Sequence, residues 1–116
     1  ISLPYTVKTI GSSAFFNCTN LNSIKLPESL ETLEEMAFCN CKNLKNLDFN
    51  QNIKKIGSNA FTNCEALQKI ELPSSMFNEK DEFGNAINPD LGDYTFQNCK
   101  GGFDTRRISN NSIWFV

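Results

Sequence analysis

The chain has 116 residues, 40% of them hydrophobic, which fits one compact domain or one short solenoid and excludes a disordered chain. Its net charge of −2, with both signs mixed along the sequence, argues against binding to nucleic acid or to an anionic lipid surface. Histidine is absent, which removes histidine bases and metal ligands, and no apolar run approaches the roughly 20 residues of a membrane span.

A short string, Phe-x-Asn-Cys, recurs along the chain and defines a repeat. The steps between its four cysteines are 23, 23 and 35 residues, so the last unit carries an insertion of 12 residues. Because the sequence starts within a unit, we expect it to be a fragment of a longer protein. We predict one solenoid domain, 1–116, with about four 23-residue repeats near 3–25, 26–48, 49–71 and 72–108.

In each unit an extended arm, Val7-x-x-Ile10 in the first, is followed by the position of Gly11, which we expect to supply an unusual backbone turn. Ser12 and the residues after it predict an N-cap and about one helical or 3₁₀ turn. One unit cannot bury its own apolar side chains, so stacked coils should pile one aromatic ring on the next. The predicted ring ladder is Phe15, Phe38, Phe61 and Phe96.

Two further ladders follow the rings. The four repeat cysteines are predicted to be small buried core residues, with a disulfide between stacked coils left open. Cys39-x-Cys41 lacks zinc-finger spacing, so we expect no metal and no other cofactor. The asparagines, of which Asn17 is the first, should hydrogen-bond backbone within their own coil. We therefore do not expect glycosylation of the sequon Asn17-Cys18-Thr19.

A strand is predicted next, because Leu21-x-x-Ile24-x-Leu26 points alternate side chains inward and outward. The polar position after it, Ser29 or Asn52, should satisfy backbone groups at the turn that leaves the strand. Stacked strands would form a parallel sheet whose exposed face is a candidate surface for a protein partner. A solvated face without a partner is the reading we favour, since aromatic and arginine anchors are missing. The outward residues are Ser23, Lys25, Asn46, Asp48, Lys69 and Glu71.

The insertion between Met76 and Leu91 contains Phe77 and Phe83 among four acidic residues. These rings could anchor a partner, or fold back over the edge of the solenoid as a local cap, which is the reading we favour. The acidic run lacks the spacing of a calcium-binding loop. At the other end, residues 109–116 are predicted to form a terminal strand or a cap over the last coil.

The whole unit, L-P-x-S/T-V/L-x-x-I-G-x-x-A-F-x-x-C-x-x-L-x-x-I, resembles the BspA-like leucine-rich repeat family. The match covers roughly residues 1–76 and returns at Leu91, with Glu34, Glu35 and Asn50 as departures. The resemblance implies a leucine-rich-repeat solenoid of the α/β class. Its parallel strands would lie on one face and its short helical or 3₁₀ turns on the other.

The same resemblance implies a function. The family occurs in surface proteins of mucosal anaerobic bacteria and protozoan parasites, which implies a cell-surface or secreted location and adhesion to a host matrix protein or another surface protein. A structural spacer or an intracellular interaction scaffold is the alternative. With no histidine, no cofactor loop and no metal set, we expect no catalytic residues and no enzyme activity.

Overall fold

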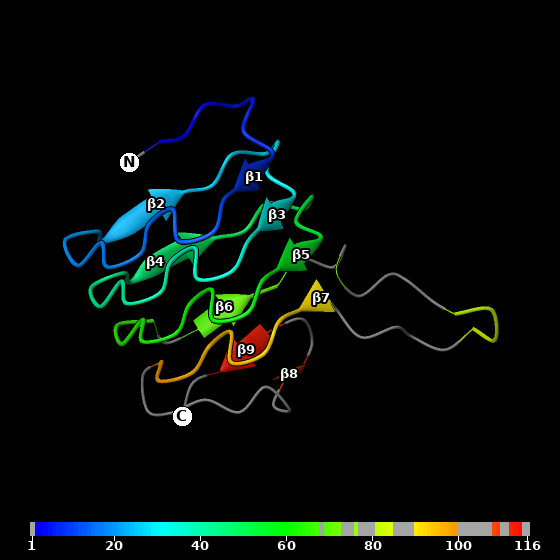
Figure 1. Ribbon diagram of the computed structural model, residues 1–116. Helices are drawn as coiled ribbons and strands as arrows, with labels where there is room; N and C mark the ends of the chain where they lie inside the picture. Colours follow the sequence, from blue (N-terminus) through cyan, green and yellow to red (C-terminus); the bar gives the residue numbers. More distant parts are fainter. Residues whose placement is uncertain are drawn as a thin grey trace.

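The computed structural model describes residues 2–67, 69–72, 76, 81–84, 90–99, 108–109 and 112–114, and the side chains of 69–71, 108–109 and 112–114 are not part of this description. The chain winds into stacked coils, each contributing short strands (Figure 1). The strands are β1 (Thr9–Ile10), β2 (Ser23–Lys25), β3 (Thr32–Leu33), β4 (Asn46–Asp48), β5 (Lys55–Ile56), β6 (Lys69–Glu71), β7 (Asp90–Leu91), β8 (Ile108–Ser109) and β9 (Ser112–Trp114).

Residues 23 apart lie side by side in neighbouring coils, which confirms the predicted repeat solenoid. On β2 and β4, Ser23 pairs with Asn46 in parallel register. On β1 and β3, Thr9 pairs with Thr32. The pairing of β5 with β7 joins Lys55 to Asp90, so the register is kept across the insertion.

The coils are joined by two parallel sheets. One sheet contains β2 and β4, and the other has the order β1-β3-β5-β7. This second sheet is formed by the arms, which the sequence predicts only as extended chain. The two strands near the C-terminus are antiparallel additions: β9 pairs with β6, and β8 pairs with β9.

The segment predicted as a helical or 3₁₀ turn forms consecutive turns, and its described residues contain no helix. Ala14 N donates to Gly11 O and Phe16 N to Ser13 O, which are i+3 turn bonds. Ser13 has a φ of 60°, which interrupts a right-handed helix. Alternate N–H groups point to the next coil instead, as Phe15 N does to Ala37 O at 2.8 Å.

The glycine position has a different role from the predicted one. Gly11, Gly57 and Gly92 are absent from the residues with positive φ, which occur two places further on, at Ser13 and its equivalents. A Cβ on Gly92 would lie 2.1 Å from Ser58 N of the preceding coil. Glycine is therefore needed at Gly57 and Gly92 for close approach of two backbones.

The aromatic ladder forms the centre of the core, as predicted. The rings of Phe15 and Phe38 stack with centroids 5.1 Å apart, those of Phe38 and Phe61 at 5.3 Å, and those of Phe61 and Phe96 at 5.5 Å. Their planes differ by 2–4°. Phe38, Phe61 and Phe96 are fully buried, so stacking of the coils removes these rings from water.

Candidate functional site

The β2–β4 sheet holds four of the proposed partner-binding residues in one exposed array. Ser23 and Lys25 lie on β2, and Asn46 and Asp48 lie opposite them on β4. All four are exposed. The residue between each pair is buried, which fixes the strands to the core and orients the polar side chains outward. We call these four residues the strand face.

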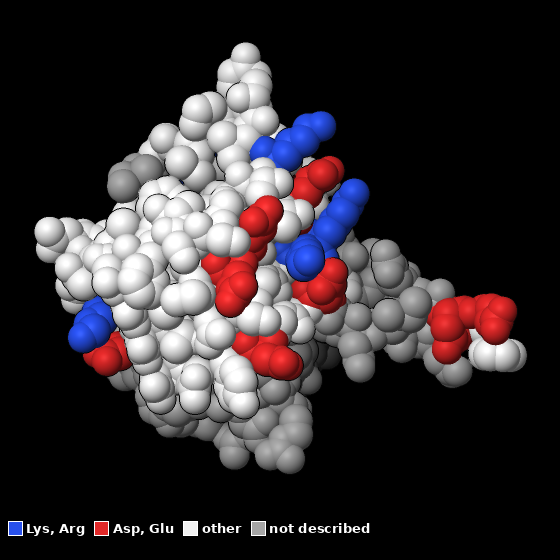
Figure 2. Space-filling model, in the orientation of Figure 1, with Lys and Arg blue, Asp and Glu red and all other residues white. Residues whose placement is uncertain are grey.

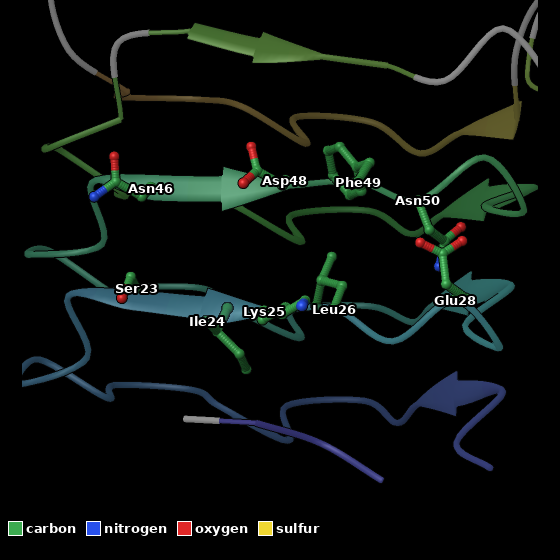
Figure 3. A pocket seen from close by; sticks show the side chains of 9 residues that line it. All are labelled: Ser23, Ile24, Lys25, Leu26, Glu28, Asn46, Asp48, Phe49 and Asn50. Atoms are coloured by element: carbon green, nitrogen blue, oxygen red, sulfur yellow. The ribbon is translucent and has the colours of Figure 1, made fainter. Parts of the chain in front are cut away.

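A cavity of about 460 Å³ opens over the strand face (Figure 3). Besides the strand-face residues, its lining includes Leu26 and Phe49, which continue the strands, and Glu28 and Asn50 at the far end. Hydroxyl, amide, ammonium and carboxylate groups thus surround a partly apolar floor. Such a lining can hold a protein segment by hydrogen bonds and charge.

Sequence reasoning missed Glu28 and Asn50 as lining residues. Asn50 occupies the proline position of the repeat and is 6% exposed. Its Nδ2 donates to Pro27 O and, at 3.2 Å, to Leu30 O, while its Oδ1 accepts from Asn52 N at 2.6 Å. The replacement of proline by a polar residue was the available signal for this link between coils.

The polar side chains after the strands hydrogen-bond backbone groups, as predicted. Their partners lie in the preceding coil. Ser29 Oγ donates to Val7 O at 2.6 Å, and Asn52 Nδ2 donates to Glu28 O at 2.7 Å. Both side chains thus satisfy carbonyl groups that the short strands leave unpaired, and they help to hold the cavity wall in place.

The two other residues predicted to bind a partner, Lys69 and Glu71, lie on β6. The backbone of β6 pairs with β9, with Lys69 opposite Trp114 and Glu71 opposite Ser112. Their side chains lie outside the described residues, so their part in a binding surface stays a prediction.

The described part of the insertion is a tight turn that presents an aromatic ring. Gly84 N donates to Asp81 O at 3.1 Å, and Phe83 N donates to Asp81 Oδ1 at 2.9 Å. Phe83 is 80% exposed, so the favoured cap reading is wrong for this ring. The carboxylate of Asp81 closes the turn that carries the exposed ring. Phe77 lies outside the described residues.

The cysteine ladder belongs to the core, as predicted. All five thiols are free, and Cys41 Sγ donates to Phe15 O and Cys64 Sγ to Phe38 O, each at 3.1 Å. Burial raises the pKa of Cys41 to about 11 and that of Cys99 to about 12. Burial raises the pKa of Cys64 as well. These thiols are therefore neutral near pH 7 and bond the carbonyls of the coil before them.

The asparagine ladder differs from its predicted form, because its bonds run between coils rather than within one. Asn40 Nδ2 donates to Asn17 Oδ1 at 2.8 Å, Asn63 Nδ2 to Asn40 Oδ1 at 2.6 Å, and Asn98 Nδ2 to Asn63 Oδ1 at 2.9 Å. All four have φ near 60°, a conformation that asparagine tolerates better than most residues.

Among the described residues, no group of three or more cysteine, aspartate or glutamate side chains is placed to hold a metal ion. The part of the chain that the structure describes also contains no helix with the length and apolar character of a membrane span.

Comparisons with known proteins agree on the architecture. A family model described as BspA type leucine rich repeat region (6 copies) matches residues 1–101. The crystal structure of a leucine-rich repeat protein from Bacteroides ovatus is similar with a TM-score of 0.70 and 27% identity, covering 85% of this chain and 25% of that one. The crystal structure of a leucine-rich repeat protein from Bacteroides capillosus is similar with a TM-score of 0.61 and 25% identity. This match covers 79% of this chain and 73% of that one. The chain thus spans a quarter of the length of the first of these proteins. A search of curated proteins finds no match.

Proposed function

The chain belongs to the BspA-type leucine-rich repeat family, whose repeat regions generally act as protein-interaction modules, and we propose that it is a non-catalytic part of a cell-surface adhesin or host-interaction protein. Its partner is a host matrix protein or another surface protein, and it binds at the strand face. The family's association with surface proteins supports this location.

The observation that carries the proposal is the in-register array of Ser23, Lys25, Asn46 and Asp48, which lines a cavity of about 460 Å³. Short strands anchored by buried Ile24 and Leu47 fix the backbone positions of these four residues. Binding of a partner therefore costs little free energy for ordering the backbone of this surface. Lys25 beside Asp48 gives the face both signs of charge, which favours a partner with a matching polar pattern.

A charge-swap experiment tests the role of the strand face. Binding of the purified chain to immobilised matrix proteins, including collagens and soluble matrix glycoproteins, is measured by surface plasmon resonance. We expect at least one of them to bind and Lys25→Glu with Asp48→Lys to weaken that binding at least tenfold.

The matched control is Glu31→Lys with Lys54→Glu. This pair also joins neighbouring coils, with 3.7 Å between Lys54 Nζ and Glu31 Oε1, and its side chains are 71% and 42% exposed. Both residues lie away from the strand face, so the control should bind as the unaltered chain does. Absence of binding to every matrix protein, or equal affinity of the two double variants, contradicts the proposal.

A spacer or intracellular scaffold remains the competing function. Surface labelling of intact source cells with an antibody to this chain separates the two, since only a surface protein is stained before the cells are permeabilised.

A further inference from the structure

The turns of the stacked coils form a second continuous surface, separate from the strand face. It is formed by those residues of the segments 13–17, 36–40, 59–63 and 94–98 that reach solvent, and we call these residues the turn face. Residues 37–39 and 60–62, in the middle of two of the segments, are buried. No residue of these four segments carries a charge. Figure 2 shows the corresponding broad white area on the front of the coils, with acidic side chains beside it. Glu35 and Asp93, both exposed, directly precede two of the segments.

The asparagine ladder runs along the turn face and keeps hydrogen-bonding capacity for a ligand. A side-chain amide has two N–H groups and an oxygen with two lone pairs. In Asn40, one N–H is used toward Asn17 and one lone pair toward Asn63. One donor and one acceptor remain, and the same holds for Asn63. Each coil therefore adds an equivalent amide group to the face.

These amides are held in place before any ligand arrives. Asn17 N donates to Cys39 O at 2.9 Å, and Asn40 N to Thr62 O and Asn63 N to Gln97 O at 2.8 Å each. The backbone and side chain of Asn17, Asn40 and Asn63 are thus both tied to a neighbouring coil. Binding to such a fixed array costs little conformational entropy.

Two exposed aromatic rings lie on the same face. Tyr94 is 64% exposed and Phe16 is 38% exposed, on the fourth and first coils respectively. A surface that carries both exposed rings and amide groups matches the two sides of a sugar: the C–H face of the sugar packs on a ring, and its hydroxyl groups bond the amides. The missing charge disfavours anionic glycans, which need lysine or arginine.

We propose that the turn face binds a linear neutral polysaccharide lying along the stacking direction of the coils, with successive sugar rings on successive asparagines. The coil interval, seen in ring centroids 5.1–5.5 Å apart, is close to the interval of hexose rings in an extended β-linked chain. The face lies on the flank of the solenoid, where stacking of the coils leaves it open. This inference does not depend on the strand face binding a protein.

The probes are the neutral hexaoses of β-linked glucose, mannose and xylose, with a heparin hexasaccharide as the anionic comparison. Binding is measured by calorimetry and by shifts of the side-chain amide signals of Asn17, Asn40, Asn63 and Asn98. We expect at least one neutral hexaose to bind and to shift these four signals, and heparin not to do so.

Tyr94→Asn removes the ring while keeping a residue that accepts the φ of 58°, as Asn59 does at the same position of the preceding coil. We expect affinity for the hexaose to fall at least tenfold. The matched control is Tyr5→Asn, which removes a ring that is 85% exposed and lies outside the turn face, and it should leave affinity unchanged.

A second variant, Gln97→Glu, adds a charge to the face and should also weaken binding. Failure of all neutral hexaoses to bind, stronger binding of heparin, or unchanged affinity of Tyr94→Asn overturns the proposal. The strand-face charge swap should leave glycan binding intact, so the two surfaces can fail separately.

Discussion

At the scale of single residues, polar side chains link one coil to the next. Asn50 occupies the repeat position at which the other coils have proline, at Pro4, Pro27 and Pro73. Its side chain is buried, donates to two carbonyls of the preceding coil and accepts from the backbone N–H of Asn52 in its own coil. The thiols of Cys41, Cys64 and Cys99 have a similar role deeper in the core, where each bonds the backbone carbonyl of a phenylalanine of the ladder.

The link through Asn50 predicts a specific loss of stability. Asn50→Ala leaves the buried carbonyl of Leu30 short of a donor and should lower the free energy of unfolding by about 1–3 kcal/mol. Urea titration measures this loss. Asn52→Ala, which removes one exposed bond to Glu28 O, should cost less than about 1 kcal/mol. Equal losses in the two variants would show that burial of Asn50 has no special effect.

The buried thiols predict a dependence of stability on pH. The unfolded chain ionises its thiols near their ordinary pKa of 9.0, whereas burial raises the pKa of Cys99 to about 12 in the folded chain. Between these values the folded state binds more protons, so stability falls as pH rises, by at most about 1.4 kcal/mol per pH unit for one thiol.

The comparison between the unaltered chain and Cys99→Ala isolates this contribution. Below pH 9 the difference in unfolding free energy between the two proteins should be constant. Above pH 9 it should shrink, because the variant has lost the thiol that titrates. A constant difference up to pH 11 speaks against a raised pKa.

At the scale of elements, the repeat pattern predicts which side chains are buried, but it does not predict the hydrogen-bond partners of the backbone. Apolar positions such as Leu33 and Phe38 follow from periodicity, because burial depends on spacing alone. The second sheet and the turns do not follow, since the N–H groups of Ser13 and Phe15 could equally have closed a helical turn within the coil. Their partners lie in the next coil, at Glu35 O and Ala37 O.

The candidate site was predictable to the same extent. Alternation along β2 and β4 predicts that Ser23, Lys25, Asn46 and Asp48 are exposed, as the structure shows. The cavity depends also on Glu28 and Asn50, which lie beyond the strands and whose placement follows from coil-to-coil bonds. A 23-residue pattern contains no information on those bonds.

Close approach of the coils at the glycine position of the repeat predicts that the same substitution has different effects on stability in two coils. Gly92→Ala would place a Cβ 2.1 Å from Ser58 N and should lower stability by about 1–3 kcal/mol. Gly11→Ala meets nothing within 4 Å and should change stability by no more than about 1 kcal/mol. Thermal unfolding of both variants decides the point, and equal melting temperatures would refute close packing at Gly92.

Exposure of the insertion turn predicts that its ring does not support the fold. Phe83→Ser should shift the free energy of unfolding by no more than about 0.5 kcal/mol, because the ring is 80% exposed. Phe38→Ala, in the stacked ladder, should cost about 3–5 kcal/mol. If Phe83→Ser destabilises the chain by more than 1 kcal/mol, as judged by urea titration, the ring acts as a cap after all.

At the scale of the whole molecule, repetition turns a 23-residue unit into long surfaces. Each coil contributes one ring to the core and one amide to the turn face, and β2 and β4 each contribute two polar residues to the strand face. Stability and surface thus grow together, since neighbours supply the packing that a single coil lacks. Both proposed binding surfaces depend on this register.

The stacking of rings is the central claim, and nuclear Overhauser effects between selectively labelled phenylalanines test it most directly. The ring protons of Phe38 should show contacts to those of Phe15 and of Phe61, whose centroids lie 5.1 and 5.3 Å away. Phe15 and Phe61 should show none to each other, because Phe38 lies between them. Missing contacts at Phe38, or a direct contact between Phe15 and Phe61, would contradict the coil register on which both faces rest.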